Sequence, residues 1–285
     1  MAAQRIARAQ ASPVAGSLLS VPDAAALTAV GFSPVGEVMG CVVQHTGWSG
    51  WGGCGYYYGS YGGSRGARVV LSSSGTAGLG PYVRALYEAW DKAIARMLAE
   101  ASAIDADGVV GVSITERFID VDTREFLVVG TAVRGAGRVR AQRPFVTDLS
   151  GADTSKLLHA GWVPSGIAFG ISIGTRHDDY RTMNSTSIFS GNTEIEAYTE
   201  LVHEVRADAR RQMSTRSRSH GGEAVIVSDM TLRIWETECS AGNQRDHSAE
   251  SRIHGTVATR FARTARPVSN TLTMLSLRDP KETFR

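Results

Sequence analysis

YVRALYEAWDKAIARMLAEASAIDADGVVGVSI, residues 82–114, is the stretch that decides the fold. Its first two thirds carry apolar side chains in alternating steps of three and four, at Val83, Leu86, Trp90, Ile94, Met97, Ala101 and Ile104. This spacing predicts an amphipathic helix. Residues 105–108 break the helix, and the β-branched run 109–114 predicts a strand that returns along it. We therefore expect helix, turn and strand to form one packing unit.

A second unit of the same kind begins at Tyr198, with the sequence YTELVHEVRADARRQMSTRSRSHGGEAVIVSDM. An offset of 116 residues places Tyr82 on Tyr198. The flanking segments also match, residues 27–36 with 157–166 at an offset of 130, and residues 130–133 with 255–258 at an offset of 125. Three matches in the same order predict a tandem duplication with insertions between the matched segments.

Length and composition limit the class of protein. A chain of 285 residues accommodates two domains of about 130 residues each. Thirty basic and 28 acidic residues leave a formal charge of +2, which gives no reason to expect a nucleic-acid or membrane partner. Three cysteines favour a reducing compartment, and no apolar run has the length of a signal peptide or a membrane span. We therefore expect a cytoplasmic protein.

The offsets and the composition also predict the domain layout. Pro144 lies in the expected junction between the two domains, and the residues after 266 show no strong periodicity. The expected segments are a flexible N-terminal tail (1–20), a first domain (21–142) with a glycine-rich and aromatic insertion (47–66), a second domain (143–265) and a C-terminal tail (266–285).

The first strand of each unit alternates in character. Met39, Cys41 and Val43 share one face in the first unit, and Phe169, Ile171 and Ile173 occupy the matching positions in the second. This alternation predicts a half-buried strand, with Cys41 as a core residue. Gly40 and Gly170 lie on the opposite face, where a glycine predicts close approach of another backbone or helix.

The insertion GWSGWGGCGYYYGSYGGSRG, residues 47–66, has two interpretations. Its glycines are typical of a flexible linker. Its aromatic residues would instead suit contact with a neighbouring subunit or cavity, because Tyr and Trp combine apolar area with a polar tip. On the second interpretation, the candidate interface residues are Trp48, Trp51, Tyr56, Tyr57, Tyr58 and Tyr61.

Three segments resemble a known family: residues 36–44, the run ADGVVGV at 106–112, and GTAV at 130–133. Together with the helix, they resemble the YbjQ family, whose descriptive name is "putative heavy-metal-binding domain". The second unit resembles the family more weakly, through residues 222–227 and 255–258. The resemblance implies two tandem α+β domains, each a mainly antiparallel β-sheet backed by one long α-helix. It also implies assembly of such domains into a ring, commonly pentameric.

The sequence offers little evidence for catalysis or metal binding. The sequence contains no Cys and His pairs at the short spacing of a zinc site. It also contains no nucleophile elbow, phosphate-binding loop or dinucleotide fingerprint. His45 and Cys54 are weak candidates for a divalent or soft metal ion. Residues 177–179, His-Asp-Asp, are weaker still because neighbouring side chains point in different directions. Glu88 matches Glu204, and a surface glutamate explains this better than a general base.

We therefore expect a non-enzymatic protein that forms a homo-oligomeric ring, with five chains as the stoichiometry implied by the resemblance. Gly40 and Gly170 would leave room for neighbours on the second face of their strands. Two functional alternatives are a metal-binding or metal-sequestering protein that uses the glycine-rich loop, and an enzyme of unrecognised type. The structural alternative to the ring is a monomer whose two domains satisfy one another.

Overall fold

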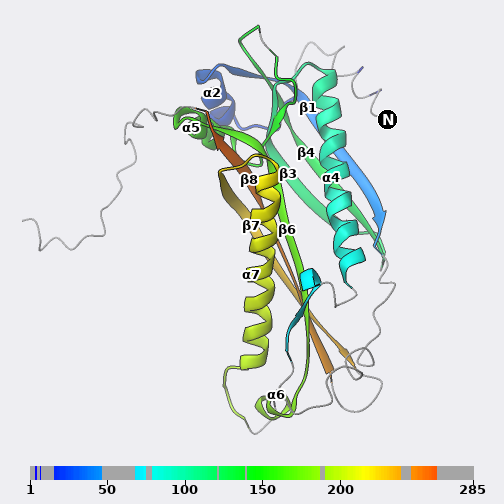
Figure 1. The fold of residues 1–285 in the computed structure, drawn as a ribbon. Helices are drawn as coiled ribbons and strands as arrows, with labels where there is room; N and C mark the ends of the chain where they lie inside the picture. Colours follow the sequence, from blue (N-terminus) through cyan, green and yellow to red (C-terminus); the bar gives the residue numbers. More distant parts are fainter. Residues whose placement is uncertain are drawn as a thin grey trace, which may run out of the picture.

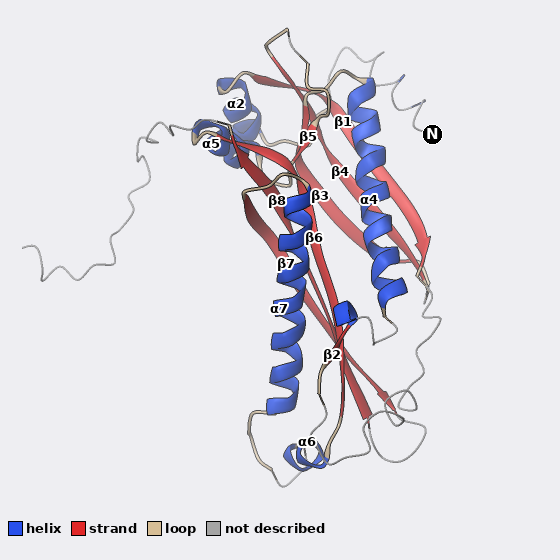
Figure 2. Ribbon diagram, in the orientation of Figure 1, coloured by secondary structure: helices blue, strands red, loops and turns tan. Residues whose placement is uncertain are grey.

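The computed structural model describes residues 16–46, 68–74, 79–120, 122–138, 140–186, 190–238 and 245–261, together with the isolated residues 4 and 7. These residues form two four-stranded sheets, each backed by a long helix (Figures 1 and 2). The predicted α+β class is therefore confirmed. The insertion 47–66 has no described residue, and residues 262–285 also lie outside the described part.

The first sheet has the strand order β1-β4-β3-β5. Its strands are antiparallel, except that β5 runs parallel to β3. Its elements and the helices beside them are α2 (Val21–Ala29), β1 (Phe32–His45), α4 (Gly80–Ala103), β3 (Gly108–Phe118), β4 (Thr123–Gly135) and β5 (Phe145–Val146).

The second sheet has the strand order β2-β6-β8-β7, and its strands are antiparallel. Helices α2 and α5 pack together at one end of the molecule, and α6 lies at the other end (Figure 1). The remaining elements are β2 (Val70–Leu71) with a 3-10 turn (Ser72–Ser74), α5 (Gly151–His159), β6 (Trp162–His177), α6 (Tyr180–Ser185), α7 (Glu196–Ser219), β7 (Ala224–Glu238) and β8 (Arg245–Arg260).

One short helix starts each half, α2 in the first and α5 in the second, and both begin with the same capping residue, a serine. The side chain of Ser20 accepts a hydrogen bond from Asp23 N, and that of Ser150 accepts one from Asp153 N. A serine at this position satisfies a backbone N–H that has no partner within the helix. Each helix then ends in a turn that leads into the first long strand of its sheet.

The long helices lie directly on the glycines of these strands. A Cβ atom on Gly40 would lie 1.8 Å from the carbonyl oxygen of Ala93 in α4, and one on Gly170 would lie 2.0 Å from that of Ala209 in α7. The predicted close approach is therefore confirmed. The expectation that these glycines leave room for a neighbouring subunit is wrong, because each half's own helix fills the space.

The buried face of β1 is the one that carries Gly40. Val38 and Val42 share this face and are buried against α4, whereas Cys41 points to the opposite face and is only half-buried. Its Sγ lies 3.4 Å from Glu125 Oε1. The expectation of a core position for Cys41 is therefore wrong, because the helix covers the other side of the strand.

One buried hydrophobic cluster spans both halves. Phe169 and Ile171 of β6 belong to the same buried cluster as Leu86 and Trp90 of α4. Short strands also join the halves, because β2 precedes α4 in sequence yet pairs with β6. Conversely β5 lies beyond the expected boundary at residue 142 yet pairs with β3 of the first sheet.

The N-terminal segment before α2 also contacts the first sheet. Leu18 N donates a hydrogen bond to Thr131 Oγ1, and Leu19 packs against the small cluster around Val110. The first half thus includes residues that we expected in a flexible tail. Within the described residues, no helix is long and apolar enough to cross a membrane.

Candidate functional site

The residues expected to bind metal or form an interface lie mostly outside the described part of the chain. Cys54 and all six aromatic candidates of residues 47–66 fall there. His45 is described, lies at the end of β1 opposite Thr123, and is exposed. Among the described residues, no group of three or more His, Cys, Asp or Glu side chains is arranged to hold a metal ion.

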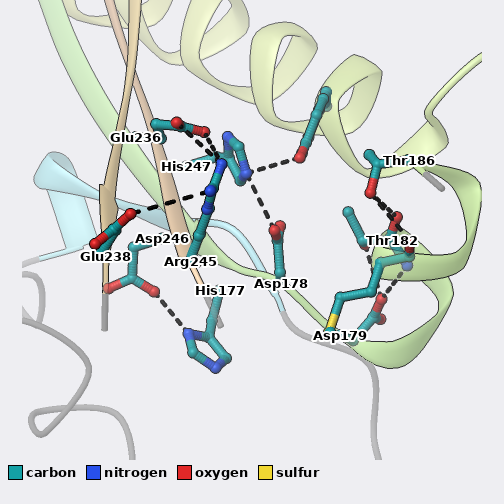
Figure 3. Close-up of polar contacts among 12 residues, drawn as sticks. His177, Asp178, Asp179, Thr182, Thr186, Glu236, Glu238, Arg245, Asp246 and His247 are labelled. Atoms are coloured by element: carbon teal, nitrogen blue, oxygen red, sulfur yellow. Dashed lines mark hydrogen bonds and ion pairs between the residues drawn. The ribbon is translucent and has the colours of Figure 1, made fainter. Parts of the chain in front are cut away.

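The structure does bring acidic and histidine side chains together where β6 ends and β8 begins (Figure 3). His177 Nδ1 lies 2.7 Å from Asp246 Oδ1, and His247 Nε2 lies 3.1 Å from Asp178 Oδ2. His177, the last residue of β6, and Asp178, which follows it, therefore contact different residues of β8. Asp179 points away from both pairs and caps α6 through Thr182 N at 2.8 Å. The three residues 177–179 thus serve three separate contacts.

The start of α7 completes this cluster. Tyr198 Oη lies 2.7 Å from His247 Nε2, the same nitrogen that faces Asp178. Burial raises the pKa of Asp178, while the nearby His247 opposes that rise. Burial also raises the pKa of Tyr198 to about 12, and the Asp178 charge adds to this effect. Nε2 of His247 thus faces both Asp178 and Tyr198, and His247 is only 9% exposed. The cluster therefore fits a structural contact between α7, β6 and β8 better than an acid–base site.

A second polar cluster lies at the seam between the two halves. Glu116 of β3 accepts a hydrogen bond from Arg124 of β4 at 2.9 Å and forms an ion pair with Arg252 of β8. Arg252 also contacts Glu250. These side chains line or adjoin a pocket of about 320 Å³ between β3 and the face of the second sheet that points away from α7. Trp90 and Phe169 form its apolar wall.

Glu250 is the most perturbed acid of this cluster. Burial raises its pKa to about 7, although the charges of Arg124 and Arg233 oppose the rise. Its Oε2 is buried and has no hydrogen-bond partner among the described residues. Arg233 is the direct cross-strand neighbour of Glu250 on β7, but its guanidinium lies over the ring of Phe118 instead. The cluster thus joins the halves through the ion pair of Glu116 with Arg252, and its three arginines outnumber its two glutamates.

Sequence reasoning missed this seam cluster. Glu116 and Arg252 are far apart in the sequence and occur in strands that alternate polar and apolar residues as surface strands do. Neither forms a short-range motif. The one sequence signal that could have pointed to the contact between the halves is the offset of 116, which places Trp90 of the first helix on Arg206 of the second.

Comparison with known proteins places the chain in a family. The family model described as "Putative heavy-metal-binding" matches residues 65–136, which lie in the first half. No solved structure matches the chain. The encapsulin nanocompartment protein Rv1762c of Mycobacterium tuberculosis is 31% identical over 234 residues, which cover 79% of this chain and 80% of the relative. This chain belongs to the family of that mycobacterial protein.

Proposed function

We propose that the chain is a non-enzymatic subunit that assembles with further copies of itself into a ring, and that its two halves arose by tandem duplication. One observation carries the assembly proposal: two similar halves meet at the seam through different surfaces. In such a contact, each half uses only one of two different surfaces. The remaining surface of one chain is therefore able to bind the other kind of surface on a second chain, and the same contact repeats from chain to chain.

The similarity of the halves extends to backbone details. Gly31 and Gly161 follow the short helices with φ angles of 85° and 83°. The β1–β4 ladder is irregular between Pro34 and Gly36, and the β6–β8 ladder is irregular at the corresponding positions, Pro164 and Gly166. Helices α4 and α7 both have 24 residues. These shared features support the duplication.

The seam uses α4 from the first half and a sheet face from the second. Trp90 of α4 stacks on Phe169, whose strand carries α7 on its other face. The matched positions are Arg206 on α7 and Met39 on β1, and both are half-buried and outside the seam. Within the described residues, the flank of α7 around Arg206 and the face of the first sheet around Met39 therefore take no part in the contact between the halves.

These two surfaces have opposite charge. The flank of α7 carries Arg206 and Arg210 beside the exposed His203. The face around Met39 carries Glu37 and Glu125, and Arg117 is the cross-strand neighbour of Glu125, so one acidic charge is in excess there. Complementary charge favours docking of one surface on the other and disfavours pairing of either with itself. A second copy of this chain is thus the partner that the surfaces fit.

The relative reported above also favours assembly of this chain with further copies of itself. The relative's name identifies it as an encapsulin nanocompartment protein, and that name favours an assembling role for this chain. Five chains in the ring follow from the YbjQ resemblance, with first and second halves at alternating positions. The aromatic residues of the insertion 47–66 would then contact a neighbouring chain or line the central space.

Light scattering at micromolar concentrations tests the assembly. We expect a species several times heavier than the 30.4 kDa chain. Arg206→Glu should dissociate it, because the substitution places a negative charge against the acidic face. Arg218→Glu, at the exposed end of the same helix, is the matched control and should not. A 30.4 kDa species that persists as concentration rises would rule out the ring.

A further inference from the structure

The outer edge of β7 differs from the matching edge of β3. β3 lies between β4 and β5, whereas β7 ends its sheet and pairs with β8 alone within the described residues. Ile226 and Val227 on β7 are 37% and 50% exposed. Val110, which matches Ile226 at the offset of 116, is fully buried. An uncovered edge with apolar side chains is an open site for another strand.

The segment around β5 covers the edge of β3 through backbone hydrogen bonds, among them the following four. Two are donated by the segment, from Phe145 N to Asp107 O at 3.1 Å and from Thr147 N to Val109 O at 3.0 Å. The other two are donated by β3, from Gly111 N to Leu149 O at 3.0 Å and from Val112 N to Thr147 O at 3.1 Å. Alternate residues of the segment therefore face β3.

Side-chain packing fixes the position of this segment. The ring of Phe145 packs edge-on against Phe32, with the ring centroids 5.7 Å apart. It also lies over Gly108, where a Cβ atom would come within 2.3 Å of the ring. A glycine on β3 thus makes room for a large side chain on the covering segment.

The chain after β8 contains a sequence like that of the covering segment. RPFVTDLS, residues 143–150, follows β4, and RPVSNTLT, residues 266–273, follows β8. Arg, Pro and Leu are identical at the matched positions, and Val268 stands where the first segment has Phe145. The two segments thus have the same place in the order of elements and share their most restrictive residue, the proline.

We propose that residues 266–273 dock along the outer edge of β7 in the same chain, parallel to it and in the register of β5 on β3. Val268 N would donate to Glu223 O, and Asn270 N to Val225 O. The side chains fit this register, because Ala224 replaces Gly108 where the smaller Val268 replaces Phe145. The seven residues from 261 to 267 are long enough to cross two strand spacings of about 4.8 Å each.

Docking in this register would cover the exposed Ile226 and Val227 and pair the first part of the β7 edge. This inference is independent of ring formation, since it concerns contacts within one chain. The experiments below measure disulfide formation and amide hydrogen exchange within one chain, whereas the ring is tested by the mass of the assembled species. Failure of one proposal is therefore distinguishable from failure of the other.

A cysteine pair tests the register directly. In a chain whose three native cysteines are replaced by serine, Ala224→Cys and Val268→Cys should form an intramolecular disulfide, because their Cα atoms would be neighbours. The control pairs Val268→Cys with Glu238→Cys at the far end of β7, which should not react. Disulfides no more frequent than in the control, or found only between chains, would overturn the proposal.

Hydrogen exchange provides a second readout that needs no cross-link. Amides on the outer edge of β7 between Val225 and Ser228 should exchange at least about tenfold faster in a chain ending at Phe261 than in the full chain. Asn270→Pro should have the same effect, because it removes a donated hydrogen bond. Ser269→Pro should not, because the matching Val146 N–H points away from β3. Equal exchange in the truncated and full-length chains would overturn the proposal.

Discussion

The indole of Trp90 stacks on the ring of Phe169, with the centroids 5.3 Å apart and the planes 10° from parallel. The ring of Phe126 meets Trp90 edge-on at 5.0 Å. Trp90 therefore joins the first sheet to the second through a single side chain. Because aromatic side chains bury large areas and prefer these two geometries, we consider Trp90 the main apolar contact between the halves.

Trp90→Ala should destabilise the whole molecule. Removing a buried tryptophan leaves a cavity and costs about 3–5 kcal/mol of unfolding free energy. Because the lost contacts lie between the halves, we also expect the urea transition to broaden or split into two steps. Equilibrium unfolding followed by circular dichroism measures both effects.

Trp162→Ala is the matched control for this change. Trp162 is half-buried and contacts the guanidinium of Arg260, 4.7 Å from its ring centroid. We expect its removal to cost less than about 1.5 kcal/mol and to leave a single transition. Equal effects of the two substitutions would contradict the central role of Trp90.

Gly40→Ala and Gly170→Ala should each separate a long helix from its sheet. The added methyl group would collide with a backbone carbonyl, which cannot rotate away as a side chain can. Overpacking of this kind costs about 1–3 kcal/mol. Gly137→Ala, where a Cβ atom meets nothing within 4 Å, is the control. Thermal unfolding should rank both strand variants below the control.

Much of the fold could be predicted from the sequence because its signals are local. The spacing from Val83 to Ile104 predicted α4, and alternation around Gly40 predicted β1 and the close approach of a helix. The boundaries were less accurate: the run 109–114 predicted a short strand, whereas β3 spans Gly108–Phe118. Hydrogen-bonded ladders extend strands beyond the residues that alternate clearly.

The contacts between the halves could not be predicted in the same way. Alternation shows that a strand has two faces but not which face a helix will cover, so Cys41 was placed in the core. Likewise nothing local shows that β2 pairs with β6, or that Glu116 meets Arg252. These contacts depend on how two complete halves pack together.

Elemental analysis of untagged protein tests the alternative of a metal-binding function. We expect no stoichiometric metal, since the described residues include no set of three suitable ligands in one place. The weak candidates His45 and Cys54 would supply at most two metal ligands. A soft metal present at one equivalent per chain, and lost on Cys54→Ser but not on Cys41→Ser, would instead favour metal binding by the glycine-rich loop.

The pH dependence of stability should reveal the buried carboxyl group of Glu250. Its pKa is raised from 4.5 to about 7 by burial, so the folded state holds this proton more tightly than the unfolded state does. Stability from this group is therefore greatest below about pH 4.5 and falls as the pH rises to about 7, by on the order of 3 kcal/mol. The neighbouring charges are Glu116, Arg124, Arg233 and Arg252, with Tyr82 of α4 and His254 nearby.

Glu250→Gln removes this titration while keeping the shape of the side chain. The difference in unfolding free energy between the variant and the wild type should therefore shift in favour of the variant as the pH rises from 4.5 to 7. Glu236→Gln, on the exposed side of β7, should show no such shift, because that carboxylate lies near Arg245 in solvent. Urea unfolding at half-unit pH intervals provides the measurement. Parallel pH profiles for wild type and Glu250→Gln would show that the carboxyl group is already ionised in the folded state, held by Arg252 or by a rotated Arg233.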